Sequence, residues 1–230
     1  MSGHRINGDG TGIRGLLLDF GSVMSVSVFE RHRQTEQLLG LPANSLTWRG
    51  PFAPETDPLW QQMQRDEISE RDYWAKRARE LGEQLGEPGW TMQTLLTRIS
   101  QVEPNTVVRP EMTRLITQTR ARGVRVGILT NELELFYGKR FLEGLGVLRE
   151  VDVFIDATHT GILKPDPRAY ALATEGLHLP PRQVLFVDDQ LRNIVGAAKV
   201  GLLTQYFDLR DVPGNIAATR ARLGLPGENM

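Results

Sequence analysis

The chain has 230 residues, a formal net charge of −1 and 40% hydrophobic residues, which is ordinary for a soluble globular protein of one domain or one domain with an insertion. It contains no cysteine, so disulfide scaffolds, cysteine-ligated metal sites and cysteine nucleophiles are excluded. Its 27 basic and 28 acidic residues nearly cancel, and no apolar run reaches the length of about 20 residues that spans a bilayer. We therefore expect a cytoplasmic protein with neither nucleic acid nor a membrane as partner.

Five apolar runs are spaced along the chain, at residues 13–20, 124–129, 151–155, 184–187 and 202–207. Nearly continuous apolar character is typical of strands that are buried on both faces of a parallel sheet. Helices are expected at 110–122, 132–145, 167–177 and 191–200. Pro110 and Pro167 stand at first helical positions, and Gly123 and Gly201 follow last ones. Strands that alternate with helices in this way predict an α/β fold with a doubly wound parallel sheet.

Residues 22–108 interrupt this alternation, because they contain helix signals and no convincing strand. The segment from Ser69 to Asp72 resembles a capping box, and another amphipathic helix is expected at 91–99. All four tryptophans fall here, either as the core of a small bundle or with one or two of them lining a substrate cavity. We predict an α/β core from 13–21 and 109–210, a helical cap insertion at 22–108, and flexible tails at 1–12 and 224–230.

Polar residues that can carry chemistry stand at the ends of the predicted strands, where the carboxyl ends of parallel strands form one crevice. They are Asp19 and Gly21 after the first strand, Thr130 and Asn131 after the second, Lys164 in the segment before the fourth, and Asp188 and Asp189 after the fourth. Neighbouring carboxylates need compensating positive charge, and oxygen ligands of this kind suit Mg²⁺, which shares its coordination sphere with water and phosphate. The sequence therefore predicts a site for a dianion, an ammonium group and a divalent metal.

These motifs, in this order and with a helical insertion after the first, resemble those of the haloacid dehalogenase-like (HAD) hydrolase superfamily, in the branch whose helical cap follows the first motif. The resemblance covers residues 13–208 and includes Asn193, the stretch 196–198 and Gly201 after the fourth motif. Residues 128–131 and 164–167 are most similar to the phosphatase domain of soluble epoxide hydrolases and to bacterial sugar-phosphate phosphatases. The resemblance implies a Rossmann-type core and a phosphatase that acts on a small phosphorylated metabolite.

Carried over residue by residue, the resemblance implies that Asp19 attacks phosphorus and forms an aspartyl-phosphate. The Thr130 hydroxyl and groups of Asn131 would bind phosphoryl oxygens. Lys164 would offset the charge on Asp19 and on the group being transferred.

The same resemblance places Mg²⁺ on the Asp19 carboxylate, the Gly21 carbonyl and Asp189, with Asp188 behind them or on a bound water. Gly21 departs from the family pattern, since most of the phosphatases carry a second aspartate there as general acid and base. Three interpretations follow. The first is that the substrate is a phosphate whose leaving group needs little protonation, such as a sugar 1-phosphate or an acyl phosphate. The second is that another group or a water moves the proton. The third is that the protein has lost catalysis and kept ligand binding.

Two other functions stay open on the sequence. A 2-haloacid dehalogenase would use Asp19 on carbon without metal, and Arg49 has about the spacing of its halide- or carboxylate-binding arginine, whereas the double acid at 188–189 favours Mg²⁺. Halide release in the presence of a chelator would support it. A non-catalytic binding protein would bind ligand without turnover. Candidates for substrate selection in the cap are Phe29, Arg31, Arg33, Trp48, Arg49, Trp60 and Arg65.

Overall fold

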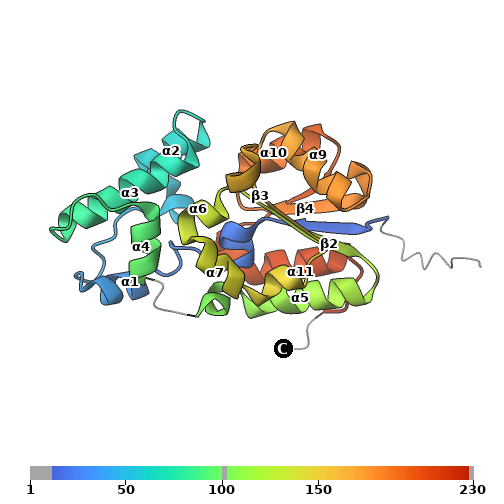
Figure 1. Ribbon diagram of the computed structural model, residues 1–230, viewed down its shortest axis with the longest axis horizontal. Coiled ribbons are helices and arrows are strands. Elements are labelled where there is room, and N and C mark those ends of the chain that lie inside the picture. The colour runs from blue at the N-terminus through green and yellow to red at the C-terminus, as the bar shows by residue number, and fades with distance from the viewer. Residues whose placement is uncertain (1–11, 100–102, 228–230) are drawn as a thin grey trace, which may run out of the picture.

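The computed structural model describes residues 12–99 and 103–227, and these contain one parallel sheet of five strands (Figure 1). The strands are β1 (Gly15–Leu18), β2 (Arg125–Thr130), β3 (Val153–Asp156), β4 (Val184–Asp188) and β5 (Leu203–Tyr206). Their order across the sheet is β3-β2-β1-β4-β5, so all five predicted strands are confirmed. β1 lies at the centre, with Leu18 beside Ile128 of β2 and Val187 of β4. The residues that follow these three strands therefore emerge side by side.

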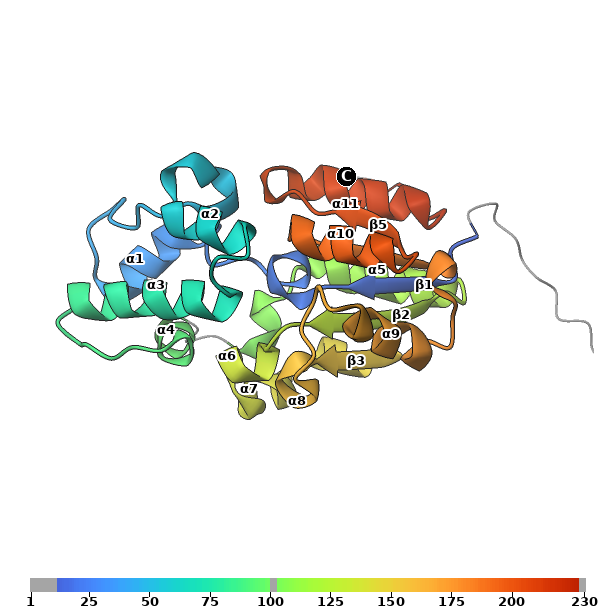
Figure 2. The same cartoon turned by 90° about the horizontal axis from the view of Figure 1, so that it is seen from above.

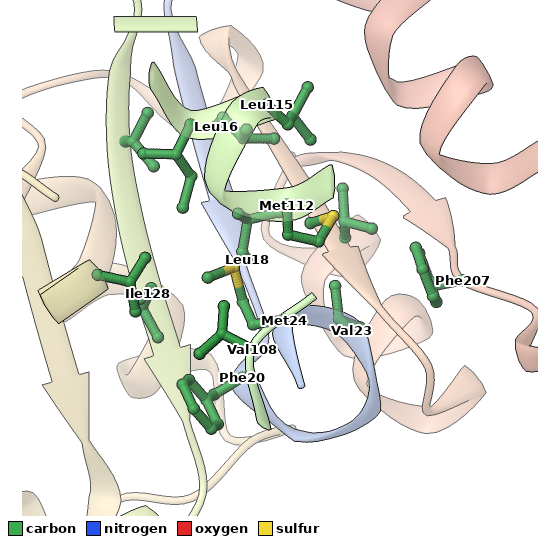
Figure 3. Close-up of a cluster of buried hydrophobic side chains, with 14 of the residues drawn as sticks. Leu16, Leu18, Phe20, Val23, Met24, Val108, Met112, Leu115, Ile128 and Phe207 are labelled. Atoms are coloured by element: carbon green, nitrogen blue, oxygen red, sulfur yellow. The ribbon is translucent and has the colours of Figure 1, made fainter. Parts of the chain in front are cut away.

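Side chains of the central strand alternate between two buried faces of the sheet. Leu16 and Leu18 pack into one apolar cluster with Met24 and Met112 (Figure 3), whereas Leu17 packs into the cluster on the opposite face. All three leucines are fully buried. A strand in the middle of a sheet that is covered on both sides has no polar face, which explains the continuous apolar run that predicted it.

Helices cover both faces of the sheet (Figures 1 and 2). α5 (Pro110–Ala121) and α11 (Val212–Arg222) lie on one face, and α9 (Pro167–Gly176) and α10 (Leu191–Lys199) lie on the other. The predicted helices 110–122, 167–177 and 191–200 are confirmed, each ending one residue earlier than expected. The fourth, 132–145, is split into α6 (Leu133–Tyr137) and α7 (Lys139–Gly144), because Gly138 has a φ of 83°, which no helix accommodates.

A separate group of helices lies at the carboxyl ends of the strands, on the left in Figures 1 and 2. It consists of α1 (His32–Leu39), α2 (Pro58–Gln64), α3 (Glu70–Gln84) and α4 (Met92–Ile99). The predicted capping box at the start of α3 is confirmed, with Ser69 and Asp72 each accepting a hydrogen bond from the other's backbone N–H at 3.1 Å. All four tryptophans are buried in an apolar cluster that these helices share, and Phe136 and Tyr137 of α6 pack against it.

The remaining elements are short. They are α8 (Ala157–Thr160) and single turns at Phe20–Met24, Gly50–Phe52, Pro54–Thr56, Pro104–Val107, Gly146–Arg149, Pro181–Gln183 and Leu209–Asp211. In the part of the chain that the structure describes, no helix is long and apolar enough to cross a membrane.

The packed core extends beyond residue 210, where the sequence analysis ended it. α11 packs on α5, and Leu225 is 8% exposed within the apolar cluster of that face. Arg122 also donates a hydrogen bond to the Gly224 carbonyl at 2.9 Å. Within this segment Leu225 packs into the core, whereas Gly224, Pro226 and Gly227 are exposed. The other residues of the expected tails, 1–11 and 228–230, lie outside the described residues.

Candidate active site

The chain leaves β1 through a tight turn that places the first motif. β1 ends at Leu18, and the irregular turn Phe20–Met24 replaces the last residues of the predicted strand. Ser22 has a left-handed φ of 63°, and Arg109 donates a hydrogen bond to its carbonyl at 3.0 Å. The backbone N–H of Asp19 still bonds to the Val187 carbonyl at 3.0 Å, so Asp19 is anchored to the sheet edge.

A cavity opens where β1, β2 and β4 end, between the sheet and the helices α1–α4. Six of the seven residues that the sequence singled out line it, and these are Asp19, Gly21, Thr130, Asn131, Lys164 and Asp189. The seventh, Asp188, is fully buried behind them. The structure therefore brings the whole predicted set together. We call these seven residues the floor of the cavity.

Lys164 is held on both its side chain and its backbone. Its ammonium donates hydrogen bonds to Asp19 Oδ1 at 2.5 Å and Asp188 Oδ2 at 2.7 Å. Its backbone N–H donates to Asn131 Oδ1 at 2.9 Å, and Asn131 Nδ2 donates back to the Lys164 carbonyl at 3.2 Å. Burial lowers the pKa of Lys164, but the carboxylates of Asp188 and Asp19 reverse this and raise it above its usual value, so the ammonium stays charged.

Asp188 is saturated with hydrogen bonds. Besides the Lys164 ammonium, its carboxylate accepts from the Gln190 backbone N–H at 2.7 Å and from Asn193 Nδ2 at 3.1 Å on each oxygen. A carboxylate with this many donors has little capacity left for a direct metal contact. Asp188 instead lies where its carboxylate holds the Lys164 ammonium in place.

Positive charge on the floor falls short of the negative charge. The described residues offer no hydrogen bond to the Asp189 carboxylate. Burial, followed by the like charges of Asp188 and Asp19, raises the pKa of Asp189 well above its usual range. Burial also raises the pKa of Asp19 to about 7, in spite of the nearby Lys164. Both pKa values are raised because the carboxylates are buried without enough counter-charge. A divalent cation would supply that charge.

The donor set fits Mg²⁺. Within residues 12–99 and 103–227, no three or more His, Asp or Glu side chains gather into a complete metal cage. Mg²⁺ does not need one, because proteins usually hold it with one or two carboxylates and leave the other positions to water and substrate phosphate. Asp19 and Asp189, with the Gly21 carbonyl as a third oxygen, match that pattern.

Helix α3 adds one further carboxylate to the described lining of the cavity, that of Glu70. Glu70 is the first residue of α3, and a guanidinium nitrogen of Arg192 on α10 lies 3.8 Å from it. Burial raises the pKa of Glu70, and Arg192 opposes this shift. In the sequence, Glu70 stands out only as part of a capping box.

Polar pairs join α2 and α3 to the loops that carry the floor. Gln64 Nε2 donates to Gln190 Oε1 at 2.6 Å, directly beside Asp189 in the sequence. Arg71 of α3 pairs with the buried Glu132, which follows Asn131 and has a left-handed φ of 57°. These contacts bridge the loops after β2 and β4 to one side of the cap.

Much of the rest of the cavity is apolar, although Ser22, Ser25, Ser27, Gln190 and Asn193 also line it. Phe29, Trp60, Trp74 and Met92 reach it from the cap and its connection, and Phe136 reaches it from α6. Of the cap residues proposed from the sequence, Phe29 and Trp60 therefore line the cavity. The others do not, and they are Arg31, Arg33, Trp48, Arg49 and Arg65. Both readings of the tryptophans hold in part, since all four are core residues and two of them also face the cavity.

Proteins of similar sequence and fold are known. The family model of haloacid dehalogenase-like hydrolases matches residues 28–201, which is most of the chain. The chain belongs to this hydrolase family. Among solved structures, the L-2-haloacid dehalogenase RSc1362 superimposes on it with a TM-score of 0.60 at 21% identity, covering 85% of this chain and 86% of the dehalogenase. The L-2-haloacid dehalogenase of Xanthobacter autotrophicus gives 0.56 at 20% identity, with 84% and 77% covered. At these identities the likeness shows the fold.

Curated relatives of this hydrolase match shorter segments. Acyl-CoA dehydrogenase family member 10 of Mus musculus is 35% identical over 117 residues, which are 51% of this chain and 11% of the mouse protein. Phosphatase MT3486 of Mycobacterium tuberculosis is 32% identical over 99 residues, 43% of this chain and 46% of that protein. The N-acetylmuramic acid 6-phosphate phosphatase of Pseudomonas putida is 30% identical over 112 residues, 46% and 50% of the two. The chain thus spans at most about half of each of these relatives.

Gly21 is not required by the backbone of the hydrolase. Its φ of −61° and ψ of 129° are ordinary for any residue. A Cβ built there would meet only Asp19 Oδ2, at 3.6 Å, which is an ordinary contact. The missing side chain at position 21 is therefore a feature of the site's chemistry rather than of its fold.

Sequence reasoning missed the residues that the cap and α10 bring to the hydrolase's site. Glu70 and Arg192 carry no signal beyond a helix start and an exposed-looking arginine. Gln190 could have been suspected, because it directly follows Asp189. Phe136 could not, since an aromatic residue in a short helix reads as core until the helix is placed against its neighbours.

Proposed function

We propose that this hydrolase is a Mg²⁺-dependent phosphatase that acts on a small phosphorylated metabolite through an aspartyl-phosphate on Asp19. The observation that carries the proposal is the charge of the floor, where Lys164 pairs with two of the three aspartates and no described residue forms an ion pair with Asp189. A phosphate dianion would be repelled by such a floor alone. It can bind there together with a divalent cation, and that combination is the one used for phosphoryl transfer.

The geometry of Asp19 supports its role as nucleophile. Lys164 holds Oδ1, and Oδ2, on the side of Gly21, accepts no hydrogen bond from the described residues. As Oδ2 bonds to phosphorus, the bond from phosphorus to the leaving oxygen breaks, and that oxygen leaves with the electron pair and takes up a proton. A water then attacks the phosphorus of the aspartyl-phosphate, gives up a proton and releases inorganic phosphate, which restores Asp19.

Other residues of the floor position the phosphate and offset its charge. Lys164 offsets charge on Asp19 and on the phosphoryl oxygens, and the Thr130 hydroxyl lines the cavity as a donor. The Asn131 side chain is engaged with the Lys164 backbone, so it acts by aiming Lys164. Bound on Asp19, Gly21 and Asp189, Mg²⁺ would supply charge neutralisation at the phosphoryl oxygens.

Gly21 restricts the substrates of such a phosphatase. Without a carboxyl group at this position, nothing on the floor hands a proton to the leaving oxygen, and general acid catalysis is typically worth about 10²–10⁴-fold. We therefore expect substrates whose leaving groups need little protonation, such as a sugar 1-phosphate, an acyl phosphate or an aryl phosphate.

The cavity favours this function over a 2-haloacid dehalogenase. A 2-haloacid carries a carboxylate and would bind without a metal ion, so Lys164 alone would have to offset that carboxylate together with Asp19 and Asp188. Arg49, the candidate from the sequence, is exposed and lines a different hollow beside His32.

In our proposal residues 22–108 serve as a cap that closes over the phosphate and excludes water.

The decisive test is phosphate release by wild type and by Asp19→Asn, with Mg²⁺ and with a chelator. We expect release to require Mg²⁺ and to disappear in the variant, because the amide keeps the shape but is a far poorer nucleophile. Glu175→Gln, an exposed isosteric change on α9, is the control and should behave as wild type. Release that survives the chelator or Asp19→Asn would refute the proposal. Halide release from 2-chloropropionate with chelator would favour the dehalogenase, and phosphate binding without turnover would favour a non-catalytic protein.

A further inference from the structure

The cavity has a second part, beyond the floor, that the proposed chemistry leaves unused. Nine apolar or aromatic residues of the described chain line it, and they are Val26, Val28, Phe29, Trp60, Trp74, Met92, Leu133, Phe136 and Tyr137. We call this set the apolar wall. A phosphate seated between Lys164 and Asp189 fills the floor, so its leaving group must occupy the space along the apolar wall.

The apolar wall is fixed in place by its own packing. The ring of Phe29 lies 5.3 Å from that of Trp60 in an edge-to-face arrangement and 5.3 Å from that of Trp74. All three side chains are at least nine-tenths buried. Rings that are packed against one another in this way have little freedom to reorient. The apolar wall therefore presents a preformed apolar surface to a ligand.

Positive charge is scarce along the apolar wall. Among the described residues that line the cavity, Lys164 is the one cation, and it already pairs with two carboxylates. Glu70 adds negative charge on the cap side. Arg31 comes near, since it lowers the pKa of Tyr137 against the larger effect of burial, but it does not line the cavity. A leaving group with a carboxylate or a second phosphate would face carboxylates with no partner of its own.

Several hydrogen-bonding groups beyond the floor are already engaged within the protein. Asn193 Nδ2 donates to Asp188, and Gln190 Oε1 accepts from Gln64. The hydroxyl of Ser27 accepts a hydrogen bond from the Glu30 N–H at 3.1 Å, and that of Ser25 accepts one from the Ser22 N–H at 3.3 Å. Both are thus partly committed to the turns that carry them. A polyhydroxylated leaving group would lose its water along the wall and regain few partners, which disfavours its binding.

We propose that the leaving group of the natural substrate is uncharged and largely apolar, and that aryl phosphates are the substrate class of this site. The inference rests on the phosphatase function proposed above and selects among the leaving groups that Gly21 permits. An aryl phosphate satisfies both parts of the cavity, because a phenolate departs with little need for a proton and its ring packs on the apolar wall.

Turnover of matched compounds tests this inference. Benzyl phosphate, glycerol 3-phosphate and phosphoglycolate all release a primary alkoxide, so the missing acid at position 21 affects them similarly and the comparison isolates polarity and charge. We expect kcat/KM to be about 10²-fold higher for benzyl phosphate than for either of the others. Equal or higher values for glycerol 3-phosphate or phosphoglycolate would overturn the inference.

A binding experiment separates this inference from the proposed function. Benzylphosphonate and phosphonoacetate cannot be hydrolysed at phosphorus, and their binding to the wild-type chain with Mg²⁺ can be measured by calorimetry. We expect benzylphosphonate to bind at least about tenfold more tightly. Preferential binding of benzylphosphonate with no turnover of any phosphate would refute the phosphatase function and support the preference for an apolar ligand. Turnover with no preferential binding of benzylphosphonate would support the phosphatase function and refute the preference for an apolar ligand.

Variants of the wall assign the preference to its residues. Phe136→Asn and Met92→Gln should each lower the ratio of kcat/KM for benzyl phosphate to that for glycerol 3-phosphate by about tenfold. The control is Leu135→Asn, next to Phe136 on α6 but 42% exposed and outside the cavity, and it should leave the ratio unchanged. An unchanged ratio in both wall variants would contradict the inference. So would a preference for phosphoglycolate that is lost in Arg31→Ala, since Arg31 would then bind an anionic leaving group.

Discussion

The floor and the apolar wall of the cavity are built by different regions and held by different forces. On the floor, Lys164 bonds to Asp19 and Asp188, and Asp188 accepts further hydrogen bonds from Gln190 and Asn193. On the wall, the Phe29 ring packs against the rings of Trp60 and Trp74. Apart from Lys164, the floor residues lie at or just after the ends of β1, β2 and β4, and small errors of their position would be costly for catalysis. The wall stands mostly on helices outside the sheet.

This difference assigns two tasks to two regions. A charge network on strand ends fixes where phosphorus and its attacking oxygen meet, and it does so without reference to the rest of the substrate. Apolar packing selects by shape and polarity, and it can change without disturbing the charges. We therefore expect substitutions on the floor to change the rate for every substrate, and substitutions on the wall to change the order of preference among substrates.

The largest expected effect comes from adding the acid that the floor lacks. Gly21→Asp fits the backbone, because position 21 has an ordinary φ and an open Cβ direction. The new carboxyl group should raise the rate for poor leaving groups such as benzyl phosphate by up to about 10²–10⁴-fold and change good aryl leaving groups much less. The measurement is a series of phosphates of graded leaving-group basicity.

Gly21→Ala is the matched control, since it adds a side chain without an acid. Wild type and Gly21→Ala should show a steep dependence on leaving-group basicity, and acid quenching should trap the aspartyl-phosphate, whose hydrolysis also lacks a base. A flat series in the wild type, with chemistry rate-limiting, would mean that another group already donates the proton. Glu70 is the carboxylate that would then be tested next.

A change of cation geometry on the floor should have the next largest effect. In Lys164→Arg the charge is kept, but a planar guanidinium cannot place donors on Asp19 and Asp188 in the space of a compact ammonium. We expect kcat to fall by about 10²–10³-fold for aryl and alkyl substrates alike. Lys199→Arg, an exposed change at the end of α10, is the control. Near-wild-type turnover in Lys164→Arg would show that the ammonium is structural.

The two aspartates after β4 should differ in their effect on the metal. Asp189→Ala removes a proposed direct ligand and should raise the Mg²⁺ concentration for half-maximal activity by roughly 10²-fold, a loss at the upper end of that seen for supporting residues of metal sites. Asp188→Asn should raise it less, because Asp188 is already saturated by Lys164, Gln190 and Asn193. Titration of activity with Mg²⁺ measures both, and the reverse order would exchange the two roles.

The contrast between floor and wall also explains how much the sequence could predict. Asp19 and Asp189 could be placed because each directly follows an apolar strand, and neighbouring parallel strands end at one edge. Position along the chain is enough to bring such residues together. The sheet, its helices and the floor were therefore predictable.

The wall was not predictable, because it depends on how the helices pack. Trp48 and Trp60 look alike in the sequence, and both are buried, yet only Trp60 reaches the cavity. Arg49 has the spacing expected of a site residue but points to a different hollow. Gly138 breaks a predicted helix, and Phe136 of the resulting short α6 lines the cavity. None of these outcomes follows from local pattern alone.

The smallest expected effect concerns a titratable group on the apolar side. His32 is 5% exposed, its ring lies 4.3 Å from that of Trp48, and both its nitrogens lack a hydrogen-bond partner among the described residues. Burial, followed by the charge of Arg49, lowers the pKa of His32 to about 4, against smaller opposing effects of Glu36 and Asp57. Unlike the floor, the cap thus holds its titratable ring neutral rather than paired.

The sign of the resulting pH dependence follows from proton binding. Between pH 6.5 and 4 the unfolded chain protonates His32 and the folded chain does not, so its contribution to stability is complete above pH 6.5 and is lost as the pH falls through this window. At pH 5 the loss is about 2 kcal/mol, from roughly 1.4 kcal/mol per pH unit. Urea unfolding of wild type and His32→Phe at pH 7 and pH 5 measures it, with the exposed His159→Asn as control. The His32→Phe chain should lose less stability on acidification by about that amount, because phenylalanine keeps the packing against Trp48 without the proton. Equal losses in the two chains would mean that the His32 ring takes up its proton within the folded cap.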